Sequence, residues 1–544
     1  MMDYKREREI DVNRILASDH PRRVVMGGPG TGKSFLFEQA IKKEMGNGKR
    51  NFLAITFIGK LGDALADDLA GLAETTTLHG FARQFVLNNC PKGWEYFPEI
   101  AEIIKEDLTA KKIESFSIGD LNYKERTKYY RAIGQDDVMH YAVEICENNK
   151  EKIPKYDLIL VDEFQDFNET EAKLIDVLAK ENKVLIVGDD DQALYEFKGS
   201  SPRFIRERFD VSNTSYESHT LKFCSRCTPV IIDAFHDIMN CVSRKTKKSD
   251  RIKKEYICYL PDKKTDGELN PKILLMKDTM PGQVPMKIKL ELSEMLKEQK
   301  VKSVLVIGEG RSCKASLLDI AMKLKIYGFK NVDHRTLNEG TFTLKRWLIA
   351  GYGILAKGTN TGLGWRILMK SLDAPAKQSI ILKSYAKAEG LASHLPKDFI
   401  ETHTKNADTL QKILTKPPSE IRQIGDSTIE KLMQQVVDGK KAEREVFVDQ
   451  LIAENKGLPR PLGSLDITVC NVLGSKGLGA DVVFLIGFDQ GKLPTKSNPT
   501  DSEIYQLLVA LTRAKKRIYL IHTGGKQISQ FIDYIKTERI ALKN

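Results

Sequence analysis

The chain carries a glycine-rich stretch at residues 27–34, Gly-Gly-Pro-Gly-Thr-Gly-Lys-Ser, which fits the pattern G-x-x-x-x-G-K-[ST]. The apolar run at residues 22–26 predicts a buried strand before it, and residues 35–41 predict a helix after it. Glycines let such a loop turn its N–H groups towards phosphate oxygens, and the N-terminus of the following helix adds positive potential. This feature therefore predicts a triphosphate-binding loop within an α/β fold.

Every residue of this loop is a candidate nucleotide contact. The Lys33 ammonium would meet the β- and γ-phosphates, and the Ser34 hydroxyl would hold Mg²⁺. The candidate binding residues of the loop are Gly27, Gly28, Pro29, Gly30, Thr31, Gly32, Lys33 and Ser34. The loop indicates only that a nucleoside triphosphate binds, so the rest of the chain has to indicate what the binding serves.

The apolar run at residues 156–161 predicts another strand of the same sheet, and acidic side chains follow it directly. Asp162 would hold Mg²⁺, because carboxylate oxygens are ligands that this ion prefers. Glu163 would orient and activate the attacking water. An acidic loop after a strand is common by itself, but together with the glycine-rich loop it predicts phosphoryl chemistry.

A further strand, predicted at residues 183–187, leads into a segment with polar and aromatic side chains. Gln192 would sense the γ-phosphate, and the rings of Tyr195 and Phe197 are suited to stacking on nucleobases. Strands that alternate with helices predict a parallel sheet with crossover connections. Residues 86–150 break this alternation and indicate a helical insertion.

Composition limits the compartment and the partners. The 544 residues, 41% of them hydrophobic, suit a folded protein of several domains, and the net charge of +11 fits a polyanionic partner without requiring one. No segment has the form of a secretory signal or the length of a membrane span, and the cysteines are scattered, so we expect free thiols and a cytoplasmic location. Cys224 and Cys227 form a C-x-x-C without a second pair at zinc-like spacing, so no zinc site is predicted.

Taken together, the motifs resemble those of the UvrD/Rep/PcrA family of superfamily 1 helicases. Residues 162–166 read D-E-F-Q-D and residues 188–199 read G-D-D-D-Q-A-L-Y-E-F-K-G, two sequences typical of that family. Further segments resemble the family's fourth, fifth and sixth motifs and a turn of its second insertion; they are residues 221–226, 467–485, 507–515 and 424–432. The resemblance extends from about residue 20 to about residue 530.

The resemblance implies an α/β fold of two RecA-like parallel-sheet domains, each interrupted by a mainly helical insertion. The implied boundaries are residues 1–85 and 150–215 for the first core, 86–149 for its insertion, 216–365 and 462–544 for the second core, and 366–461 for its insertion. Both insertions are compact, and in this family such insertions engage duplexes and protein partners.

The resemblance also implies that ATP and Mg²⁺ bind between the two cores. Arg226 of the fourth motif and Arg513 of the sixth would contact the γ-phosphate, and Gly477 of the fifth would lie at the nucleotide. The implied activity is ATP-driven 3′→5′ translocation on single-stranded DNA, as a translocase or helicase. The family positions that contact the strand are occupied by Phe57, Lys60, His79, Tyr195, Phe197 and Lys198.

The sequence departs from the family where the nucleoside would be read. No Gln precedes the loop to recognise adenine, Ser225 replaces the family's Tyr, and Phe35 replaces its Arg. Gly479 stands where the family has a Glu near the ribose. We therefore expect relaxed base selectivity, with Phe35 as a substitute stacking contact. The alternative is that backbone groups or an upstream residue such as Asn13 replace the missing contacts.

Two other functions compete with that of a DNA translocase or helicase. One is a UvrD-like, nucleic-acid-stimulated NTPase that serves as sensor or motor for a partner nuclease in a bacterial defence system, with little unwinding of its own. The other is a nucleic-acid scaffold with an inactive ATPase, against which the retained triphosphate residues argue. Stacking and phosphate contacts do not distinguish RNA from DNA. No membrane contact is expected, and the basic run at residues 244–254 fits either a solvated linker or a contact with nucleic acid or a partner.

Overall fold

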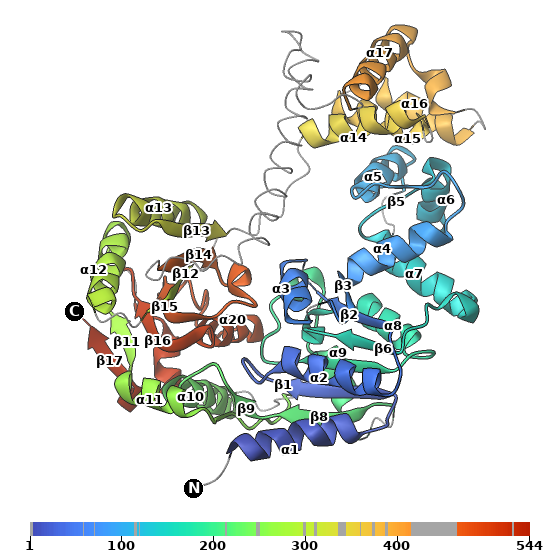
Figure 1. The fold of residues 1–544 in the computed structure, drawn as a ribbon. Coiled ribbons are helices and arrows are strands. Elements are labelled where there is room, and N and C mark those ends of the chain that lie inside the picture. The colour runs from blue at the N-terminus through green and yellow to red at the C-terminus, as the bar shows by residue number, and fades with distance from the viewer. Residues whose placement is uncertain are drawn as a thin grey trace. The chain divides into compact units, whose positions relative to one another are not determined.

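The computed structural model describes residues 4–57, 59–69, 71–113, 117–118, 120–210, 212, 215–245, 251–297, 301–308, 313–335, 344–358, 361–372, 376–386, 390–414, 465–524 and 527–543. The fold is drawn in Figure 1, and its contacts divide the chain into two compact units. The first unit comprises Met1–Leu78, Ile153–Asn338 and Pro461–Asn544, and the second comprises His79–Lys152 and Glu339–Arg460. Each unit is therefore built from segments that are distant in the sequence.

A six-stranded parallel sheet forms one half of the first unit. In spatial order its strands are β3 (Glu74–Thr77), β2 (Phe52–Thr56), β6 (Leu158–Val161), β7 (Val184–Gly188), β1 (Arg22–Gly27) and β8 (Glu217–Leu221). The four central strands are buried along almost their whole length, as parallel strands covered on both faces usually are. The strands predicted before the glycine-rich loop, before Asp162 and before Gln192 are β1, β6 and β7. The predicted parallel α/β sheet is confirmed.

A seven-stranded sheet, also with parallel pairings throughout, forms the other half of this unit. Its strands in spatial order are β13 (Asn331–Arg335), β14 (Asp466–Asn471), β12 (Ser303–Gly308), β15 (Ala480–Ile486), β16 (Ala514–Ile521), β11 (Ile273–Met276) and β17 (Ile540–Lys543). The sheet therefore combines strands from before and after the segment that belongs to the second unit. Two separate parallel sheets are consistent with two RecA-like domains.

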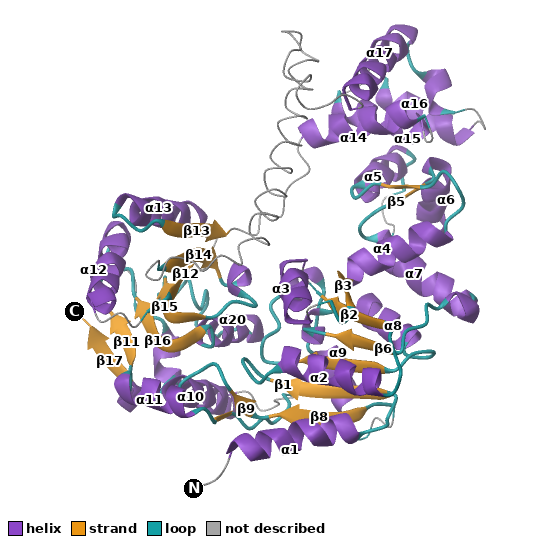
Figure 2. Cartoon of the chain, in the orientation of Figure 1, coloured by secondary structure: helices purple, strands orange, loops and turns teal. Residues whose placement is uncertain are grey.

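Helices cover both faces of these sheets (Figure 2). In the first unit they are α1 (Tyr4–Ala17), α2 (Lys33–Gly46), α3 (Gly59–Leu69), α8 (Glu169–Leu178), α9 (Arg203–Phe209), α10 (Pro229–Lys245), α11 (Pro261–Leu269), α12 (Val284–Lys297), α13 (Cys313–Ile326) and α20 (Asp501–Leu511). Local sequence fixes where two of them begin. Asn168 with Glu171 and Thr500 with Glu503 form reciprocal capping boxes at α8 and α20, which satisfy N–H groups that the helix itself cannot.

A short link, residues 222–228, joins the two halves of the first unit. After β8 the chain passes through a single residue into β9 (Phe223–Cys224), which pairs with β10 (Ile257–Cys258). The link thus leaves the six-stranded sheet beside β1, the strand that leads into the glycine-rich loop. One hydrophobic core contains residues 193–195, the link, α10, α20 and β15, so both halves share buried packing.

The second unit is mainly helical, as predicted for the insertions. It contains α4 (Leu78–Asn89), α5 (Ile100–Ala110), α6 (Leu121–Tyr130), α7 (Asp137–Asn148), α14 (Leu344–Lys357), α15 (Thr361–Ser371), α16 (Lys377–Ala386) and α17 (Lys397–Leu414), with the short parallel pair β4 (Glu95–Tyr96) and β5 (Ala132–Ile133). Its core joins both segments, since Phe97 packs edge-on against Trp347.

A buried ionic cluster also joins the two segments of the second unit. The Asp107 carboxylate accepts hydrogen bonds from Arg126 Nε at 3.0 Å and from Arg366 Nε at 2.9 Å. The Tyr130 hydroxyl donates to the same carboxylate at 2.5 Å. Burial excludes water from these groups, so each charge depends on its partners.

The units differ from the expected domain boundaries in two places. Strand β8 pairs with β1, so the first sheet continues past residue 215 to Leu221. Helix α14 packs against α15 and α17, and the second unit resumes at Glu339 and not at residue 366. The remaining boundaries stay predictions, and residues 424–432 lie outside the described residues.

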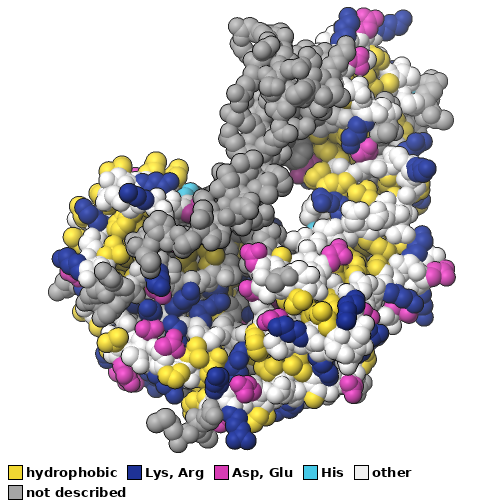
Figure 3. All heavy atoms as spheres, viewed as in Figure 1, with side chains coloured by type: hydrophobic (Ala, Val, Ile, Leu, Met, Phe, Trp, Pro, Cys, Tyr) yellow, Lys and Arg dark blue, Asp and Glu magenta, His cyan; other side chains and the backbone are white. Residues whose placement is uncertain are grey.

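Among the described helices, none combines the length and the apolar character needed to span a bilayer. Lys and Arg side chains gather on the face shown in Figure 3, over the part of the first unit that holds the seven-stranded sheet.

Candidate nucleotide site and its surroundings

The glycine-rich loop joins β1 to α2, and residues distant in the sequence hold its backbone. The Pro29 carbonyl accepts hydrogen bonds from the Tyr256 hydroxyl and from Cys224 Sγ, the latter at 3.3 Å. The Gly30 carbonyl accepts from the Ser225 N–H at 2.8 Å and from the Ser225 hydroxyl at 2.9 Å. The loop is therefore fastened to the link that joins the two halves of the first unit.

Two glycines of the loop are required by close contacts. A Cβ atom on Gly28 would lie 2.4 Å from the Tyr256 ring. A Cβ atom on Gly30 would lie 2.4 Å from Arg226 Cβ, and its φ of +70° would strain any other residue. The loop and the link thus approach each other so closely that side chains are excluded.

The loop borders a cavity of about 840 Å³. From the loop and the six-stranded sheet it is lined by Pro29, Gly30, Thr31, Gly32, Lys33, Ser34, Phe35, Asp162, Glu163 and Gln192. From the link and the seven-stranded sheet it is lined by Ser225, Arg226, Gly477 and Arg513. The structure thus brings the predicted triphosphate residues together, except that Gly27 and Gly28 lie behind the wall. The Gly27 carbonyl there accepts a hydrogen bond from Lys33 Nζ at 3.4 Å.

The two acidic residues after β6 have opposite electrostatic environments. Burial, together with the neighbouring Glu163 carboxylate, raises the pKa of Asp162 to about 7. Burial also opposes ionisation of Glu163, but Lys33 and Lys476 outweigh it and hold the pKa of Glu163 below its usual range. The Lys33 ammonium lies 3.8 Å from the Glu163 carboxylate. Glu163 is therefore an ionised carboxylate at the cavity, as a base that positions water requires.

An Mg²⁺ ion fits the residues on this side of the cavity. The Ser34 hydroxyl and the Asp162 carboxylate are hard oxygen donors that line the same wall. Burial and the Glu163 carboxylate raise the pKa of Asp162 despite the nearby Lys33 and Lys476, and a bound divalent cation would favour its ionised form. Both predicted metal ligands thus offer suitable oxygen atoms and line the same part of the cavity.

Gln192 connects the six-stranded sheet to the second predicted arginine. Arg513 Nη2 donates to Gln192 Oε1 at 2.8 Å, and the amide nitrogen of Gln192 donates to Asp189. Arg513 also donates from Nε to the Val509 carbonyl at 3.0 Å, which fixes the guanidinium at the cavity wall. Burial and the nearby Arg226 lower the pKa of Arg513 to about 10, so it remains positively charged at neutral pH.

Lys476 is a site residue to which the sequence had assigned no role. It lies in the predicted fifth motif, next to Gly477, and its ammonium pairs with Asp166 and lies 3.4 Å from Glu163. It also donates to the Gln192 carbonyl at 3.3 Å. A lysine directly before the motif glycine was the only signal in the sequence, because its partners are about 300 residues away.

Phe35, the expected stacking contact for the base, also lines the cavity. The Phe35 side chain is 39% exposed, and the Arg8 guanidinium of α1 lies over its ring at 4.6 Å from the centroid. The charged residues Asp262, Lys263 and Asp266 of α11 line the same cavity. Asn13, considered above as a substitute for the missing Gln, is exposed and does not line the cavity.

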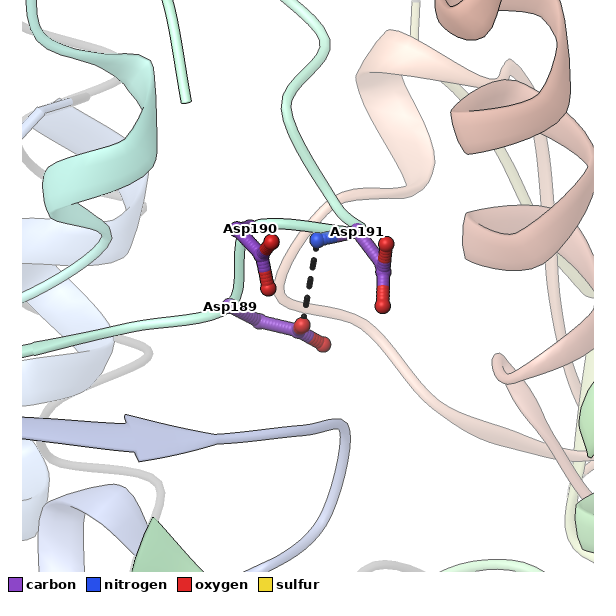
Figure 4. A group of neighbouring side chains, drawn as sticks. All are labelled: Asp189, Asp190 and Asp191. Atoms are coloured by element: carbon purple, nitrogen blue, oxygen red, sulfur yellow. Dashed lines mark hydrogen bonds between the residues drawn. The ribbon is translucent and has the colours of Figure 1, made fainter. Parts of the chain in front are cut away.

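Three consecutive aspartates follow β7 (Figure 4), and one carboxylate oxygen of each lies within 4.8 Å of those of the other two. A cluster of this kind would suit a metal ion, but the buried Lys254 ammonium contacts all three carboxylates. It lies 2.6 Å from Asp190 and 2.7 Å from Asp191. Burial would lower the pKa of Lys254, but the three carboxylates outweigh it and raise this pKa well above its usual range. The lysine thus holds the position that a cation would take.

Two more cations complete this aspartate cluster. Arg206 pairs with Asp190 at 2.8 Å, and Arg251 lies 3.5 Å from Asp191. Arg251 and Lys254 belong to the basic run for which we expected either a solvated linker or an external contact. Both instead pair with carboxylates inside the first unit. The side chains of residues 244–250 of this run are not among those that the structure describes.

The predicted nucleic-acid residues of the first unit form one aromatic group. The Tyr195 ring lies 4.8 Å from the Phe57 ring and 5.9 Å from the Phe197 ring, measured between centroids. Phe197 is 61% exposed, and the Lys198 ammonium lies 5.8 Å from its ring centroid. For Lys60, which is in α3, only the backbone is described. His79 near the start of α4 belongs to the second unit and is described with it.

Comparison with known proteins agrees with this arrangement. A family described as an AAA domain matches residues 13–198, which contain the loop, the acidic pair and Gln192. DNA helicase II of Rickettsia typhi is 22% identical over 470 residues, which cover 74% of this chain and 68% of that protein. The similarity to that protein thus extends over most of the chain, beyond the nucleotide-binding segment alone.

Shorter and closer similarity links the chain to two other bacterial proteins. An ATP-dependent helicase/nuclease subunit of Lactococcus lactis subsp. lactis is 32% identical over 124 residues, 22% of this chain and 10% of that protein. The exonuclease/helicase protein RexA of L. lactis subsp. cremoris is 33% identical over 91 residues, 16% of this chain and 8% of that protein. The chain thus matches no more than about a tenth of the length of these relatives.

Proposed function

The chain is a UvrD-like member of helicase superfamily 1, and on that premise we propose that it is a DNA-dependent ATPase that translocates 3′→5′ along single-stranded DNA. The observation that carries the proposal is the cavity that collects the loop, the acidic pair, Gln192 and both predicted arginines. Its volume suits a nucleotide-sized ligand.

ATP would lie with its triphosphate on the loop and α2. Lys33 would bind the β- and γ-phosphates, and Glu163 would orient the attacking water and accept its proton. Mg²⁺ held by Ser34 and Asp162 would offset the charge of the phosphates. Arg226 and Arg513 would stabilise the charge that develops on the γ-phosphate, an effect worth about 10³–10⁵ in rate for an arginine supplied in this way.

Because these residues come from both halves of the first unit, hydrolysis would require the halves to be closed on the nucleotide. Binding would favour the closed state and product release the open one. In the aromatic group of Phe57, Tyr195 and Phe197, the exposed Phe197 ring would stack on bases of the strand, at about 1–3 kcal/mol per base, while the buried Tyr195 would support it from beneath. Repeated closure would then move the protein along the strand.

The direct test is ATP hydrolysis by the purified chain with and without an unstructured single-stranded DNA. We expect stimulation of at least tenfold, and a loss of at least 100-fold in Lys33→Ala. The matched control is Lys42→Ala in the same helix, whose side chain is 53% exposed and pairs with Glu38 at the surface. Unwinding of 3′-tailed but not 5′-tailed duplexes would report the polarity. Hydrolysis that responds to no nucleic acid would contradict the proposal.

The Phe35 ring at the cavity wall supports relaxed base selectivity. A stack on Phe35 would accept any base, because every base has a π face. We expect kcat/KM for ATP, GTP and CTP to agree within about tenfold, and Phe35→Ala to raise KM for all three with little change in kcat. Leu290→Ala, which shortens an exposed side chain of α12 away from the cavity lining, is the control. A preference for ATP above 100-fold would contradict this.

A second function is favoured by the local similarity to the ATP-dependent helicase/nuclease of L. lactis. In this second function, the ATPase would serve as motor or sensor for a separate nuclease, which would bind through the second unit. DNA-stimulated hydrolysis without unwinding of tailed duplexes would favour this function over that of an autonomous helicase. The same assays with single-stranded RNA would decide which nucleic acid is preferred.

A further inference from the structure

Two buried cysteines flank the predicted arginine of the fourth motif. Cys224 Sγ donates to the Pro29 carbonyl of the glycine-rich loop at 3.3 Å. Cys227 Sγ donates to the Thr512 carbonyl at 3.6 Å, directly before Arg513. The two thiols thus hold backbone groups on opposite sides of the cavity, and Arg226 lies between them in the sequence.

The two sulfur atoms also interact with each other. The Cys227 N–H donates to Cys224 Sγ at 3.4 Å, two residues before α10 begins. The interaction with the Cys227 side chain lowers the pKa of Cys224 to about 7, and the same interaction raises the pKa of Cys227. Cys470, buried without such a partner, behaves in the opposite way, since burial raises the pKa of its thiol to about 12.

We propose that Cys224 and Cys227 are a redox-active dithiol that a small hydroperoxide converts to a disulfide, which suppresses nucleotide hydrolysis at the adjoining cavity. The dithiol chemistry stands on the cysteine geometry alone, and its effect on hydrolysis rests on the proposed function. Ser225 and Arg226 line the cavity, and the two cysteines that flank them in the sequence are fully buried, so the oxidant has to be as small as hydrogen peroxide.

The reaction balances with peroxide as the oxidant. The Cys224 thiolate attacks one oxygen of hydrogen peroxide, the O–O bond breaks, and a sulfenic acid and hydroxide form. The Cys227 sulfur then attacks the sulfenic sulfur, its proton leaves with the hydroxyl group as water, and the S–S bond forms. In total, two thiols and one peroxide give one disulfide and two waters.

The disulfide would alter both sides of the cavity. Its formation removes both S–H donors, so the Pro29 and Thr512 carbonyls each lose a hydrogen bond. It also closes a short ring around Arg226, which moves the guanidinium that the proposed mechanism places at the γ-phosphate. Because such an arginine is worth about 10³–10⁵ in rate, we expect hydrolysis to fall at least tenfold.

The experiment treats the reduced, full-length protein with hydrogen peroxide and follows three quantities. Mass spectrometry after alkylation reports the 224–227 disulfide, turnover reports hydrolysis, and a fluorescent ATP analogue reports nucleotide binding. We expect the disulfide to form, hydrolysis to fall at least tenfold, and dithiothreitol to restore it. In Cys224→Ser we expect no disulfide and a treated-to-untreated activity ratio near one, whereas the matched control Cys470→Ser should respond as the wild type does.

Two results would overturn the proposal. One is that Cys224 and Cys227 remain fully alkylatable after peroxide treatment of the native protein. The other is that the disulfide forms while turnover and analogue binding both stay unchanged. A reduced protein without any turnover would count against the proposed function. The disulfide and analogue measurements would still decide whether Cys224 and Cys227 form a redox-active pair that affects the cavity.

Discussion

The Lys476 ammonium lies 5.7 Å from the centroid of the Tyr195 ring and, at the same time, 3.4 Å from the Glu163 carboxylate. One buried cation therefore contacts both the aromatic group and the acid of the cavity. Displacement of Tyr195 by a stacked base would move the charge that keeps Glu163 ionised. This contact offers a short physical route by which a bound strand could alter hydrolysis.

The exposed ring of Phe197 is the simplest test of the aromatic group. We expect Phe197→Ala to weaken binding of a single-stranded oligonucleotide by about 1–3 kcal/mol, the contribution of one stacked base. Fluorescence anisotropy with a labelled oligonucleotide measures it. Phe35→Ala should leave this affinity unchanged, because Phe35 borders the nucleotide cavity. Equal affinities for wild type and Phe197→Ala would exclude the ring as a contact.

Removal of Lys254 should destabilise the first unit and uncover a cation site. Lys254→Ala leaves three close carboxylates with only Arg206 and Arg251, at a cost of about 3–5 kcal/mol for a broken buried pair. We expect a lower melting temperature that Ca²⁺ partly restores in nucleotide-free Lys254→Ala but not in wild type.

The neighbouring Lys253 is exposed and provides the control for that experiment. Lys253→Ala should melt as the wild type does, with or without Ca²⁺. A rise in the melting temperature of the wild type with Ca²⁺ as large as that of Lys254→Ala would show that Lys254 does not occupy the cation position of the aspartate cluster.

In the second unit, Arg366 should matter far more than a surface ion pair between the same two segments. Arg366 is fully buried, and Arg366→Met leaves Asp107 short of one partner, which costs about 3–5 kcal/mol. Lys357→Met breaks a pair with Glu95 in which the lysine is 62% exposed, at a cost of about 0–1 kcal/mol. Denaturant unfolding measures both. A loss of unfolding free energy below about 1 kcal/mol in Arg366→Met would contradict the stabilising role of the buried pair with Asp107.

Glu106 should make the second unit sensitive to acid. Burial alone would raise its pKa, but hydrogen bonds from Lys370 and Arg366 outweigh it and lower the pKa of Glu106 to about 2, from an ordinary 4.5. Because the folded-state pKa is depressed, its stabilisation is complete above pH 4.5 and disappears as the pH falls towards 2.

The measurement is the difference in unfolding free energy between wild type and Glu106→Gln. We expect it to be largest near pH 7 and to shrink between pH 4.5 and pH 2. Glu102→Gln, at a neighbouring residue whose side chain is 55% exposed, should show a smaller difference at every pH. A difference for Glu106→Gln that does not change with pH would refute the role of this carboxylate.

Features encoded in short segments were predicted from the sequence. The glycine-rich loop, the strands before Asp162 and Gln192 and the parallel sheet follow from apolar runs bounded by glycines and polar residues. The loop, the acidic pair and Gln192 were also predictable, because each lies at the end of such a run, whereas Arg226 and Arg513 were expected only from the resemblance to the helicase family. The sheet constrains these positions, since the carboxyl ends of parallel strands share one edge.

What could not be predicted depends on contacts between distant segments. Lys254 pairs with carboxylates 63 to 65 positions earlier, and Lys476 with an aspartate 310 positions earlier. No periodicity or local motif records such partners. The extension of the first sheet to β8 was missed for the same reason, because its strand has polar residues and is recognised only by its pairing with β1.

The buried pair of Asp107 and Arg366 also has a consequence for biosynthesis. They are 259 positions apart, and a stretch of that length takes roughly 13–50 seconds to synthesise at about 5–20 residues per second. The six-stranded sheet, whose last strand ends at Leu221, is fully translated long before that. On a ribosome, the second unit would therefore remain half-assembled while the nucleotide-binding half is already folded. A pulse of protease during translation should cut near residues 79–152 until Arg366 has emerged.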